Sequence, residues 1–366
     1  ILVGPGTYGG GISTKGKWLT IKSTDGVDVT IIEGSGSGTG INVEGAIGSG
    51  GIFTIEGFTF KNHSVGLHLG SEWPEVRVSK SVFIKNGHGI TNWAGMIKVS
   101  YCQFYDHTGS AIQGSEITTF KSPIVDHSVF ARNVTGGWGG AIARGGAASN
   151  CVFYGNRASG GRGDDVDLSG PFVNCIFWDM RYANNGANQE ITYSIFELSN
   201  GGDELAGLDP LFLDVTSDDY RLSAASPAID AGDPSSPKDP DGTRADIGAY
   251  YYNTDEPQDG ARLTVNVSRL AAGSVFVNQS ETVVLQITNG GDEELKITEA
   301  ELDSSNFEIS GFEPVTVAAN GGKGTVSVNY SPTLEGKEEA ILTLVSNDPS
   351  KPAFTITVTG IGFDPQ

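Results

Sequence analysis

Four aspartates in the second half of the chain are the residues best suited to bind a metal ion. Asp230, Asp239, Asp241 and Asp246 lie in turn-rich sequence, and the stretch 203–259 around them holds 14 Asp and Glu against 3 Lys and Arg, a net charge of −11. Concentrated carboxylates repel one another unless they are solvated or bridged, and Ca²⁺ takes oxygen ligands from such turns. The four residues therefore predict a Ca²⁺ site. The competing interpretation is that each carboxylate caps a turn by accepting hydrogen bonds from backbone amides.

A second acidic group follows a Gly-rich stretch near the middle of the chain. It consists of Asp164, Asp165 and Asp167. Three carboxylates on one turn could bind a cation, but a solvated acidic loop is the interpretation that the sequence favours.

Two tryptophans, Trp93 and Trp138, fall in or beside Gly-rich loops. An indole ring that is exposed on one side can stack on a sugar ring, so both residues are candidates for glycan binding. The alternative is that each ring packs over the edge of a neighbouring turn. Both possibilities follow from the same sequence context.

The sequence assigns no catalytic residue. The five histidines show no metal-ligand spacing, and no Ser, His and Asp arrangement stands out. A polysaccharide lyase needs a base and a cation that neutralises the uronate carboxylate, yet Lys and Arg total only 23 and form no regular column. The sequence therefore favours a non-catalytic role, and a lyase or glycoside hydrolase is the alternative.

These candidate residues are carried by a repeat. A small residue, any residue and then Phe recur along the chain, often with Asn three places after the Phe, and the spacing of 19 to 26 residues is typical of a solenoid. The recurring aromatic positions are Phe60, Phe83, Phe104, Phe130, Phe153, Phe177 and Phe196. Short β-prone runs and turns between them predict three strands per coil, and hence a parallel β-helix.

The alternation of side chains along a strand places the repeated Phe and the small residue before it on one face. We therefore expect a Phe stack in the core, beside a column of Cys and Ser that includes Cys102, Cys151 and Cys175. A disulfide between Cys151 and Cys175 on adjacent coils is sterically conceivable, whereas Cys102 should be free. The Asn residues are expected at turns, where they form a polar ladder with the next coil.

Composition limits the kinds of partner. The formal charge of −21 argues against nucleic acid and anionic membrane surfaces as partners, because proteins that bind them present basic residues. No apolar run reaches the length that spans a bilayer. The first eight residues read as the middle of a strand and turn, so we expect the chain to lack its true beginning.

The pattern changes after an acidic closing segment. Seven alternating strands between 263 and 358 have the spacing of a β-sandwich. The predicted organisation is β-helix coils at 1–207, the closing segment at 208–252, a linker at 253–261 and an immunoglobulin-like sandwich at 262–366.

Three parts of the sequence resemble known families. The Phe-x-x-Asn phrases, with Gly-Gly-Ala-Ile at 139–142, resemble right-handed parallel β-helix repeats of bacterial polymorphic outer-membrane and pectate-lyase-like proteins. The motifs LDPLFL at 208–213, SPAIDAGD at 226–233 and DIGAYY at 246–251 resemble the "choice-of-anchor Q" segment that ends such helices. The part from 262 to 362 resembles "choice-of-anchor D" or HYDIN-like immunoglobulin-like domains. These resemblances imply an exported bacterial surface protein and no particular reaction.

The sequence thus predicts an all-β protein, with a right-handed parallel β-helix followed by an immunoglobulin-like β-sandwich. Its expected role is structural or adhesive, in a surface layer, filament or matrix outside the cell. The expected partners are other surface proteins, copies of itself or polysaccharide. The alternative is a polysaccharide-active enzyme or a glycan-binding module on the β-helix.

Overall fold

A computed structural model describes the chain except residues 45–50, 71–74, 93–95, 115–122, 161–162, 168–169, 180–190, 198–206, 254–259, 266, 268, 320, 350 and 365–366. The chain forms two compact units. The first contains Ile1–Leu208 and Asp230–Tyr251, and the second contains Asp209–Ile229 and Tyr252–Gln366. The acidic closing segment predicted at 208–252 is therefore divided between the units. Most of the predicted linker at 253–261 lies outside the described residues, and its last residue, Ala261, is buried in the core of the second unit.

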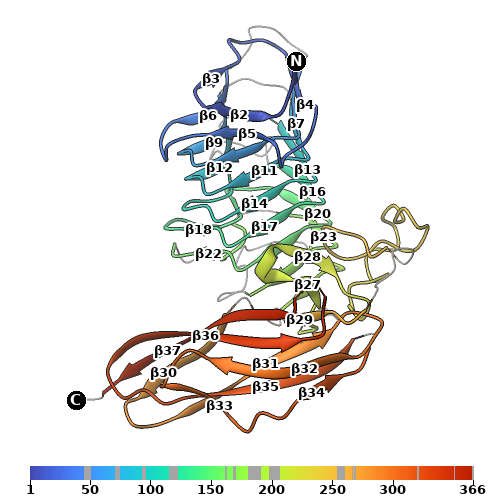
Figure 1. Ribbon diagram of the computed structural model, residues 1–366. Coiled ribbons are helices and arrows are strands. Elements are labelled where there is room, and N and C mark those ends of the chain that lie inside the picture. The colour runs from blue at the N-terminus through green and yellow to red at the C-terminus, as the bar shows by residue number, and fades with distance from the viewer. Residues whose placement is uncertain are drawn as a thin grey trace. The chain divides into compact units, whose positions relative to one another are not determined.

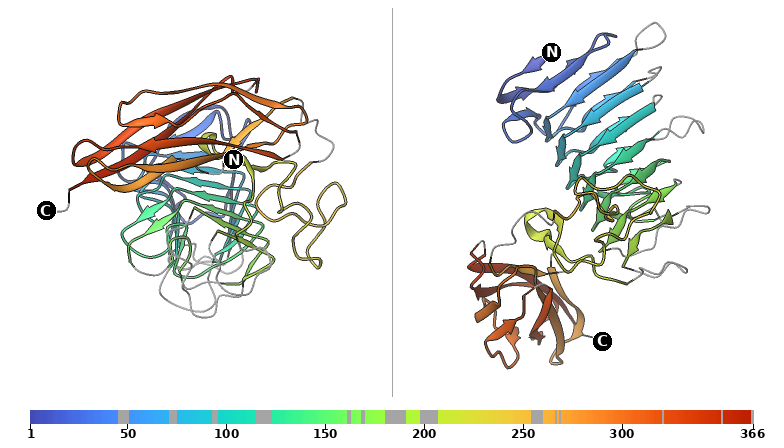
Figure 2. Two further views of the ribbon diagram at one scale, coloured as in Figure 1. Left: turned by 90° about the horizontal axis from the view of Figure 1, so that it is seen from below. Right: turned by 90° about the vertical axis from the view of Figure 1, so that its right-hand side faces the viewer.

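The first unit is a parallel β-solenoid built from three sheets, in which every described neighbour pair is parallel. Its coils stack as successive layers (Figures 1 and 2). The first sheet contains, in spatial order, β1 (Leu2–Val3), β4 (Thr20–Ser23), β7 (Ile52–Glu56), β10 (Glu75–Ser79), β13 (Met96–Ser100), β16 (Ile124–Asp126), β20 (Ala147–Ser149), β23 (Phe172–Val173) and β25 (Ile191–Thr192). The second contains β2 (Gly6–Gly9), β5 (Thr30–Glu33), β8 (Thr59–Lys61), β11 (Val82–Ile84), β14 (Gln103–Tyr105), β17 (Val129–Ala131), β21 (Val152–Tyr154), β24 (Ile176–Trp178) and β26 (Ile195–Phe196).

The third sheet has fewer strands than the other two and carries residues of the candidate site. It contains β3 (Ile12–Ser13), β6 (Thr39–Val43), β9 (Val65–Leu69), β12 (His88–Asn92), β15 (Ile112–Gln113) and β19 (Ile142–Ala143). A further pair, β18 (Val134–Thr135) and β22 (Arg157–Ala158), lies beside it in the later coils.

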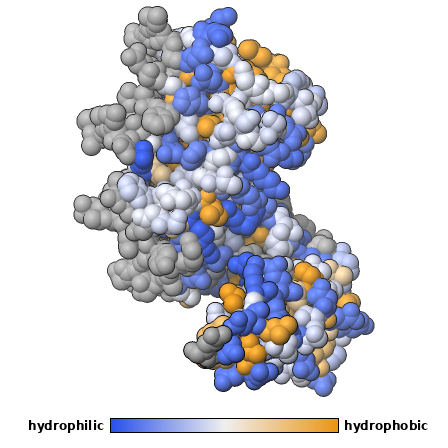
Figure 3. All heavy atoms as spheres, turned by 90° about the vertical axis from the view of Figure 1, so that its left-hand side faces the viewer, coloured by the Kyte–Doolittle hydropathy of each residue, from blue (hydrophilic) through white to orange (hydrophobic). Residues whose placement is uncertain are grey.

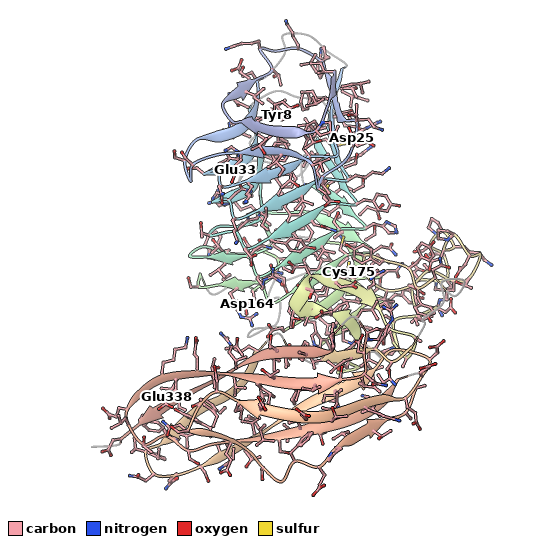
Figure 4. All side chains as sticks on the ribbon, in the orientation of Figure 1. Tyr8, Asp25, Glu33, Asp164, Cys175 and Glu338 are labelled. Carbon is pink, nitrogen blue, oxygen red and sulfur yellow. The ribbon has the colours of Figure 1, made fainter. Side chains whose placement is uncertain are left out.

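The predicted Phe column is confirmed. Neighbouring rings from Phe60 to Phe196 stack with centroids 4.7–5.2 Å apart and interplanar angles of 2–7°. That separation equals the distance between neighbouring strands of a sheet, so each coil adds one ring to the stack. Cys102, Cys151 and Cys175 are buried beside this column and are unpaired, and Cys175 lies inside the coils in Figure 4.

Part of the acidic segment covers the outer face of the second sheet. The side chains of Val129, Val152 and Ile176 alternate with the Phe column and so point away from it, yet they are at most 1% exposed. Asp230–Tyr251, which we call the cover segment, lies over them. A Cβ added at Gly248 would lie 2.9 Å from Ile176 Cδ1, and Gln103 Nε2 donates to Tyr250 Oη at 2.9 Å. The segment therefore buries a hydrophobic face that the coils alone leave open.

The second unit is an immunoglobulin-like sandwich of two sheets with a short hairpin attached. One sheet has the order β29 (Leu263–Val265), β31 (Glu281–Asn289), β35 (Gly322–Tyr330), β33 (Phe307–Ile309). The other has the order β30 (Arg269–Phe276), β37 (Ala353–Phe363), β36 (Gly336–Ser346), β32 (Leu295–Leu302), β34 (Val315–Val317). The seven predicted strands are present. The sequence analysis missed β30, whose alternation is broken at Gly273, and the short β34.

The hairpin belongs to the second unit through buried polar contacts. It consists of β27 (Phe212–Asp214), a 3-10 turn (Val215–Ser217) and β28 (Asp219–Leu222). Lys351 Nζ lies 3.0 Å from Asp214 Oδ2 and donates to the Leu263 carbonyl at 2.9 Å. Burial disfavours the charged carboxylate, but hydrogen bonds from Thr216 and the Lys351 ammonium outweigh it and lower the pKa of Asp214.

Candidate functional site

A column of buried polar side chains runs inside the solenoid, at the position three residues after each Phe. Asn86, His107, Asn133 and Asn156 are at most 1% exposed. Each Asn amide donates to the carbonyl of the Phe in the preceding coil: Asn86 Nδ2 to Phe60 at 3.0 Å, Asn133 Nδ2 to Phe104 at 3.1 Å and Asn156 Nδ2 to Phe130 at 3.0 Å. Their Oδ1 atoms accept the backbone amides of His63, His107 and Asn133. The predicted polar ladder is confirmed, and we call it the inner polar column.

His107 is the one member of this column that is not an asparagine. Its Nδ1 accepts the Asn86 amide at 3.1 Å, so the neutral ring carries its proton on Nε2. Within the described part of the chain, that buried Nε2 has no hydrogen-bond partner. Burial lowers the pKa of His107 to about 3, with the nearby His88 adding to the effect. His107 therefore holds the fold as a neutral ring and is not arranged as a metal ligand.

The inner polar column ends on the second acidic group. Asn156 Nδ2 donates to Asp165 Oδ1 at 2.8 Å, and Asp164 Oδ1 accepts the Ala158 amide at 2.8 Å. Asp164, Asp165 and Asp167 are at most 1% exposed, and Asp164 lies within the coils in Figure 4. The interpretation of these residues as a solvated loop is wrong, because their backbone extends the third sheet through a bridge between Ile142 and Val166. Burial raises the pKa of Asp165 to about 7.

The four aspartates predicted to bind Ca²⁺ lie on the cover segment, where the carboxylates of Asp239, Asp241 and Asp246 accept backbone hydrogen bonds. Asp246 Oδ1 accepts the Asp230 amide at 2.7 Å, Asp239 Oδ2 accepts the Asp246 amide at 2.8 Å, and Asp241 Oδ1 accepts the Thr243 amide at 3.0 Å. Burial raises the pKa of Asp239, whereas the Thr243 amide lowers the pKa of Asp241. These contacts fit the interpretation of the residues as turn caps. No group of three or more His, Cys, Asp or Glu suited to a metal ion occurs among the described residues, and Ca²⁺ binding stays a prediction.

One of the two candidate tryptophans lines a hollow beside the third sheet. Trp138 is partly exposed, and its Nε1 donates to the Gly160 carbonyl at 2.9 Å. A Cβ added at Gly160 would lie 2.2 Å from Trp138 Cδ1, so glycine is required where the indole edge packs. Packing and access to solvent thus coexist at this residue. Trp93 lies outside the described residues.

The hollow has a volume of about 340 Å³, and hydrogen-bonding groups surround the indole. Gln113 comes from β15, Arg144 follows β19, and Ser110 and Thr135 supply hydroxyls. Ser110 Oγ donates to the Trp138 carbonyl at 3.3 Å, which joins two neighbouring coils. We call this the Trp138 hollow. Its described lining contains no Asp or Glu, and glycoside hydrolysis commonly uses two such carboxylates.

The sequence analysis missed Gln113 and Arg144 as site residues. Gln113 follows Ile112, whose side chain is fully buried in the core, so strand alternation places Gln113 on the outer face. That signal was present in the sequence. The sequence alone does not show that Trp138, on the next coil, lies beside Gln113, so Gln113 could not be recognised as a site residue.

A second hollow, of about 470 Å³, opens near the first coils. Its lining includes Glu33, Thr39, His63 and several glycines. His63 is 2% exposed, and its Nε2 lies 3.1 Å from the Ile32 carbonyl, so this nitrogen carries a proton and donates a hydrogen bond to the carbonyl. His63 occupies the same repeat position as Asn86, and its contact with the preceding coil resembles that of the inner polar column. Glu33, labelled in Figure 4, accepts from Asn62 Nδ2 at 3.0 Å.

Comparisons with known proteins identify the second unit only. A family model described as "ASH: Abnormal spindle-like microcephaly-assoc'd, ASPM-SPD-2-Hydin" matches residues 262–354. A search of curated proteins finds no match. The HYDIN-like resemblance of the sandwich is thereby supported, whereas the choice-of-anchor resemblances are not confirmed.

Solved structures match about a third of the chain or less, at low identity. The ASH or PapD-like domain 7 of human CEP192 is 10% identical over 34% of this chain and 99% of its own, with a TM-score of 0.25. A protein of unknown function from Porphyromonas gingivalis is 15% identical over 28% of this chain and 46% of its own, with a TM-score of 0.25. The secreted serine protease VesC from Vibrio cholerae is 17% identical over 29% of this chain and 23% of its own, with a TM-score of 0.23.

The fold class predicted from sequence is confirmed: the protein is a parallel β-solenoid with an immunoglobulin-like domain after it. Among the described residues, no helix has the length and apolar character needed to cross a bilayer.

Proposed function

We propose that this protein is an exported, surface-attached adhesive protein that binds a glycan at the Trp138 hollow. The choice-of-anchor motifs in the sequence support attachment to a bacterial surface. The architecture, a solenoid followed by an immunoglobulin-like domain, is compatible with a structural or adhesive role. The Ca²⁺ predicted at Asp230, Asp239, Asp241 and Asp246 would, in this proposal, strengthen the cover segment.

The Trp138 hollow is the observation that carries the proposal. A partly exposed indole offers an apolar face, while Gln113, Ser110 and Thr135 offer donors and acceptors at its edge. Sugar rings combine apolar C–H faces with hydroxyl groups around the rim, which is the chemistry that such a lining complements. The lack of Asp and Glu in its described lining favours binding over hydrolysis.

The face shown in Figure 3 favours glycan recognition over a broad protein interface. On the face shown in Figure 3, the described hydrophobic residues form small separate groups among polar ones. Protein interfaces that hold permanent assemblies usually contain a continuous apolar core. Adhesion through a carbohydrate needs only a small hollow.

The test is a binding measurement on the whole chain with neutral and acidic polysaccharides, by affinity electrophoresis and calorimetry. We expect Trp138→Ala to weaken binding of the best ligand at least about fivefold, equivalent to ~1 kcal/mol. Tyr101→Ala is the matched control, because Tyr101 is an aromatic residue with 55% exposure outside the hollow. The proposal fails if no polysaccharide binds, or if both variants bind as well as the unmodified protein.

The same incubations test the enzymatic alternative. Each polysaccharide is assayed for unsaturated products, which a lyase would release, and for new reducing ends, which a hydrolase would release. The proposal expects neither. Accumulation of either product with the unmodified protein would show that the solenoid is catalytic and would overturn the proposed adhesive role.

A further inference from the structure

We propose that the ligand is a linear, uncharged polysaccharide that extends from the Trp138 hollow along the third sheet, parallel to the solenoid axis. This inference rests on the proposed function and specifies its ligand. The residues that would contact the chain are Ser13, Asn42, His68, Thr91 and Gln113, which we call the outer polar row.

Strand register aligns these residues, although unequal loops separate them in the sequence. Ser13 pairs with Asn42, Asn42 with His68, His68 with Thr91 and Thr91 with Gln113. Each comes from the next strand of one sheet, and β3, β6, β9 and β12 follow one another down one side of the solenoid in Figure 1. Consecutive members are therefore about 4.8 Å apart, the spacing between neighbouring strands.

The outer polar row faces away from the core. The residues that precede Asn42, His68, Thr91 and Gln113 are at most 1% exposed and belong to the hydrophobic core, namely Ile41, Leu67, Ile90 and Ile112, whereas Ile12 before Ser13 is 37% exposed. Side chains alternate along a strand, so the row lies on the opposite face. Asn42, His68 and Gln113 are partly exposed. Thr91 is more deeply placed, and its Oγ1 lies 2.7 Å from His68 Nδ1.

The row meets the Trp138 hollow at Gln113. Gln113 is the last polar member of the row and also lines the hollow, and its register partner Ala143 lines the hollow as well. A ligand held by the indole is therefore in register with the polar side chains of the preceding coils, of which Asn42 and His68 are partly exposed and Thr91 is 5% exposed. That alignment distinguishes an extended site from an isolated pocket.

The chemistry of the row suits hydroxyl groups. Its members are amides, hydroxyls and one imidazole, all of which can pair with sugar hydroxyls as donors or acceptors. Burial lowers the pKa of His68, so its ring is neutral near pH 7. The row thus contains no ammonium or guanidinium to hold a succession of uronates, although Arg144 lines the hollow at its end, and the net charge of −21 repels a polyanion.

The regular spacing argues for a linear ligand. A polymer that runs along the axis meets one equivalent polar residue per coil, so contacts accumulate with its length. A branched or compact ligand would contact only the residues at one end. The geometry therefore predicts that affinity grows with chain length.

The experiment measures the affinity of the whole protein for oligosaccharides of one neutral glycan, from disaccharide to octasaccharide, by calorimetry. Uronic acid oligosaccharides of the same lengths are the comparison. We expect at least about a tenfold gain in affinity from tetrasaccharide to octasaccharide, a factor that corresponds to ~1.4 kcal/mol. The neutral series should bind more tightly than the acidic one.

The double variant Asn42→Ala/His68→Ala should lose most of the gain with length while it keeps the affinity for short sugars. The control is Ser79→Ala/Ser100→Ala, two paired residues on the first sheet, which should behave like the unmodified protein. Thermal melts verify that the variants are folded. Equal affinity for short and long neutral chains, or preference for the acidic series, would overturn the linear ligand but leave glycan binding intact. Failure of every oligosaccharide and polysaccharide to bind would overturn the proposed function as well.

Discussion

The inner polar column and the outer polar row belong to the same solenoid, but the column is buried and most of the row is partly exposed to solvent. Asn133 and Asn156 in the column are buried, and their amides are used by backbone groups of the preceding coil. Asn42 and Gln113 in the row are partly exposed and face away from the core. A polar repeat inside a solenoid therefore holds neighbouring coils together, while a polar repeat on the outside can bind a ligand.

The largest expected effect is in the inner polar column. Asn133→Ala removes the hydrogen bonds from Nδ2 to the Phe104 carbonyl and to Asn156 Oδ1, and the bond that Oδ1 accepts from the His107 amide. Buried groups without partners are costly, so we expect the free energy of unfolding of the first unit to fall by about 3 kcal/mol or more. Urea unfolding checks this. A loss below about 1 kcal/mol would mean that the column does not hold the coils together.

His107→Asn should instead increase stability. Asn at this position can donate to the Phe83 carbonyl as its neighbours do, and the variant removes the buried Nε2 that has no partner among the described residues. We expect a gain of about 1–3 kcal/mol at pH 8. A loss of stability would show that the ring fills space that Asn cannot.

The gain from His107→Asn should also depend on pH. The pKa of His107 in the folded protein is about 3, so between pH 3 and the ordinary His value of about 6.5 the unfolded state binds a proton that the folded state does not. The stability of the unmodified protein therefore falls as pH is lowered through this range, by at most ~1.4 kcal/mol per pH unit from this residue. The variant lacks this contribution, so its advantage should widen from pH 8 to pH 5 in parallel unfolding curves.

The smallest expected effect on stability is in the outer polar row. Gln113→Ala removes a partly exposed side chain from the edge of the Trp138 hollow. Such substitutions usually change the free energy of unfolding by at most about 0.5 kcal/mol. A larger loss, measured by the same urea unfolding, would assign Gln113 to the fold and weaken its role in binding.

Sequence could predict the parts of the solenoid that repeat in an obvious way. The Phe column and the Asn ladder follow from a fixed phrase, and the structure confirms both. His107 was not assigned to the ladder from the sequence, because it is a histidine at a repeat position that holds asparagine in the neighbouring coils. The burial of Val152 and Ile176 depends on a cover segment that lies far away in the sequence.

The candidate site was predictable only in part. Trp138 was identified from its Gly-rich context, but the residues around it come from other coils, and loops of unequal length hide their register. The burial of Asp164 and Asp165 was missed for a related reason: an acidic turn appears solvated until the backbone beside it is seen to continue a sheet.

The most direct test of the difference between column and row is to measure stability and glycan affinity on two variants in parallel. The ligand is the neutral polysaccharide that binds the unmodified protein most tightly. We predict that Gln113→Ala keeps its melting temperature and loses affinity, whereas Asn133→Ala has a lower melting temperature and, where it is still folded, retains affinity. The opposite pattern, with Gln113→Ala unstable or Asn133→Ala folded but unable to bind, would contradict the account.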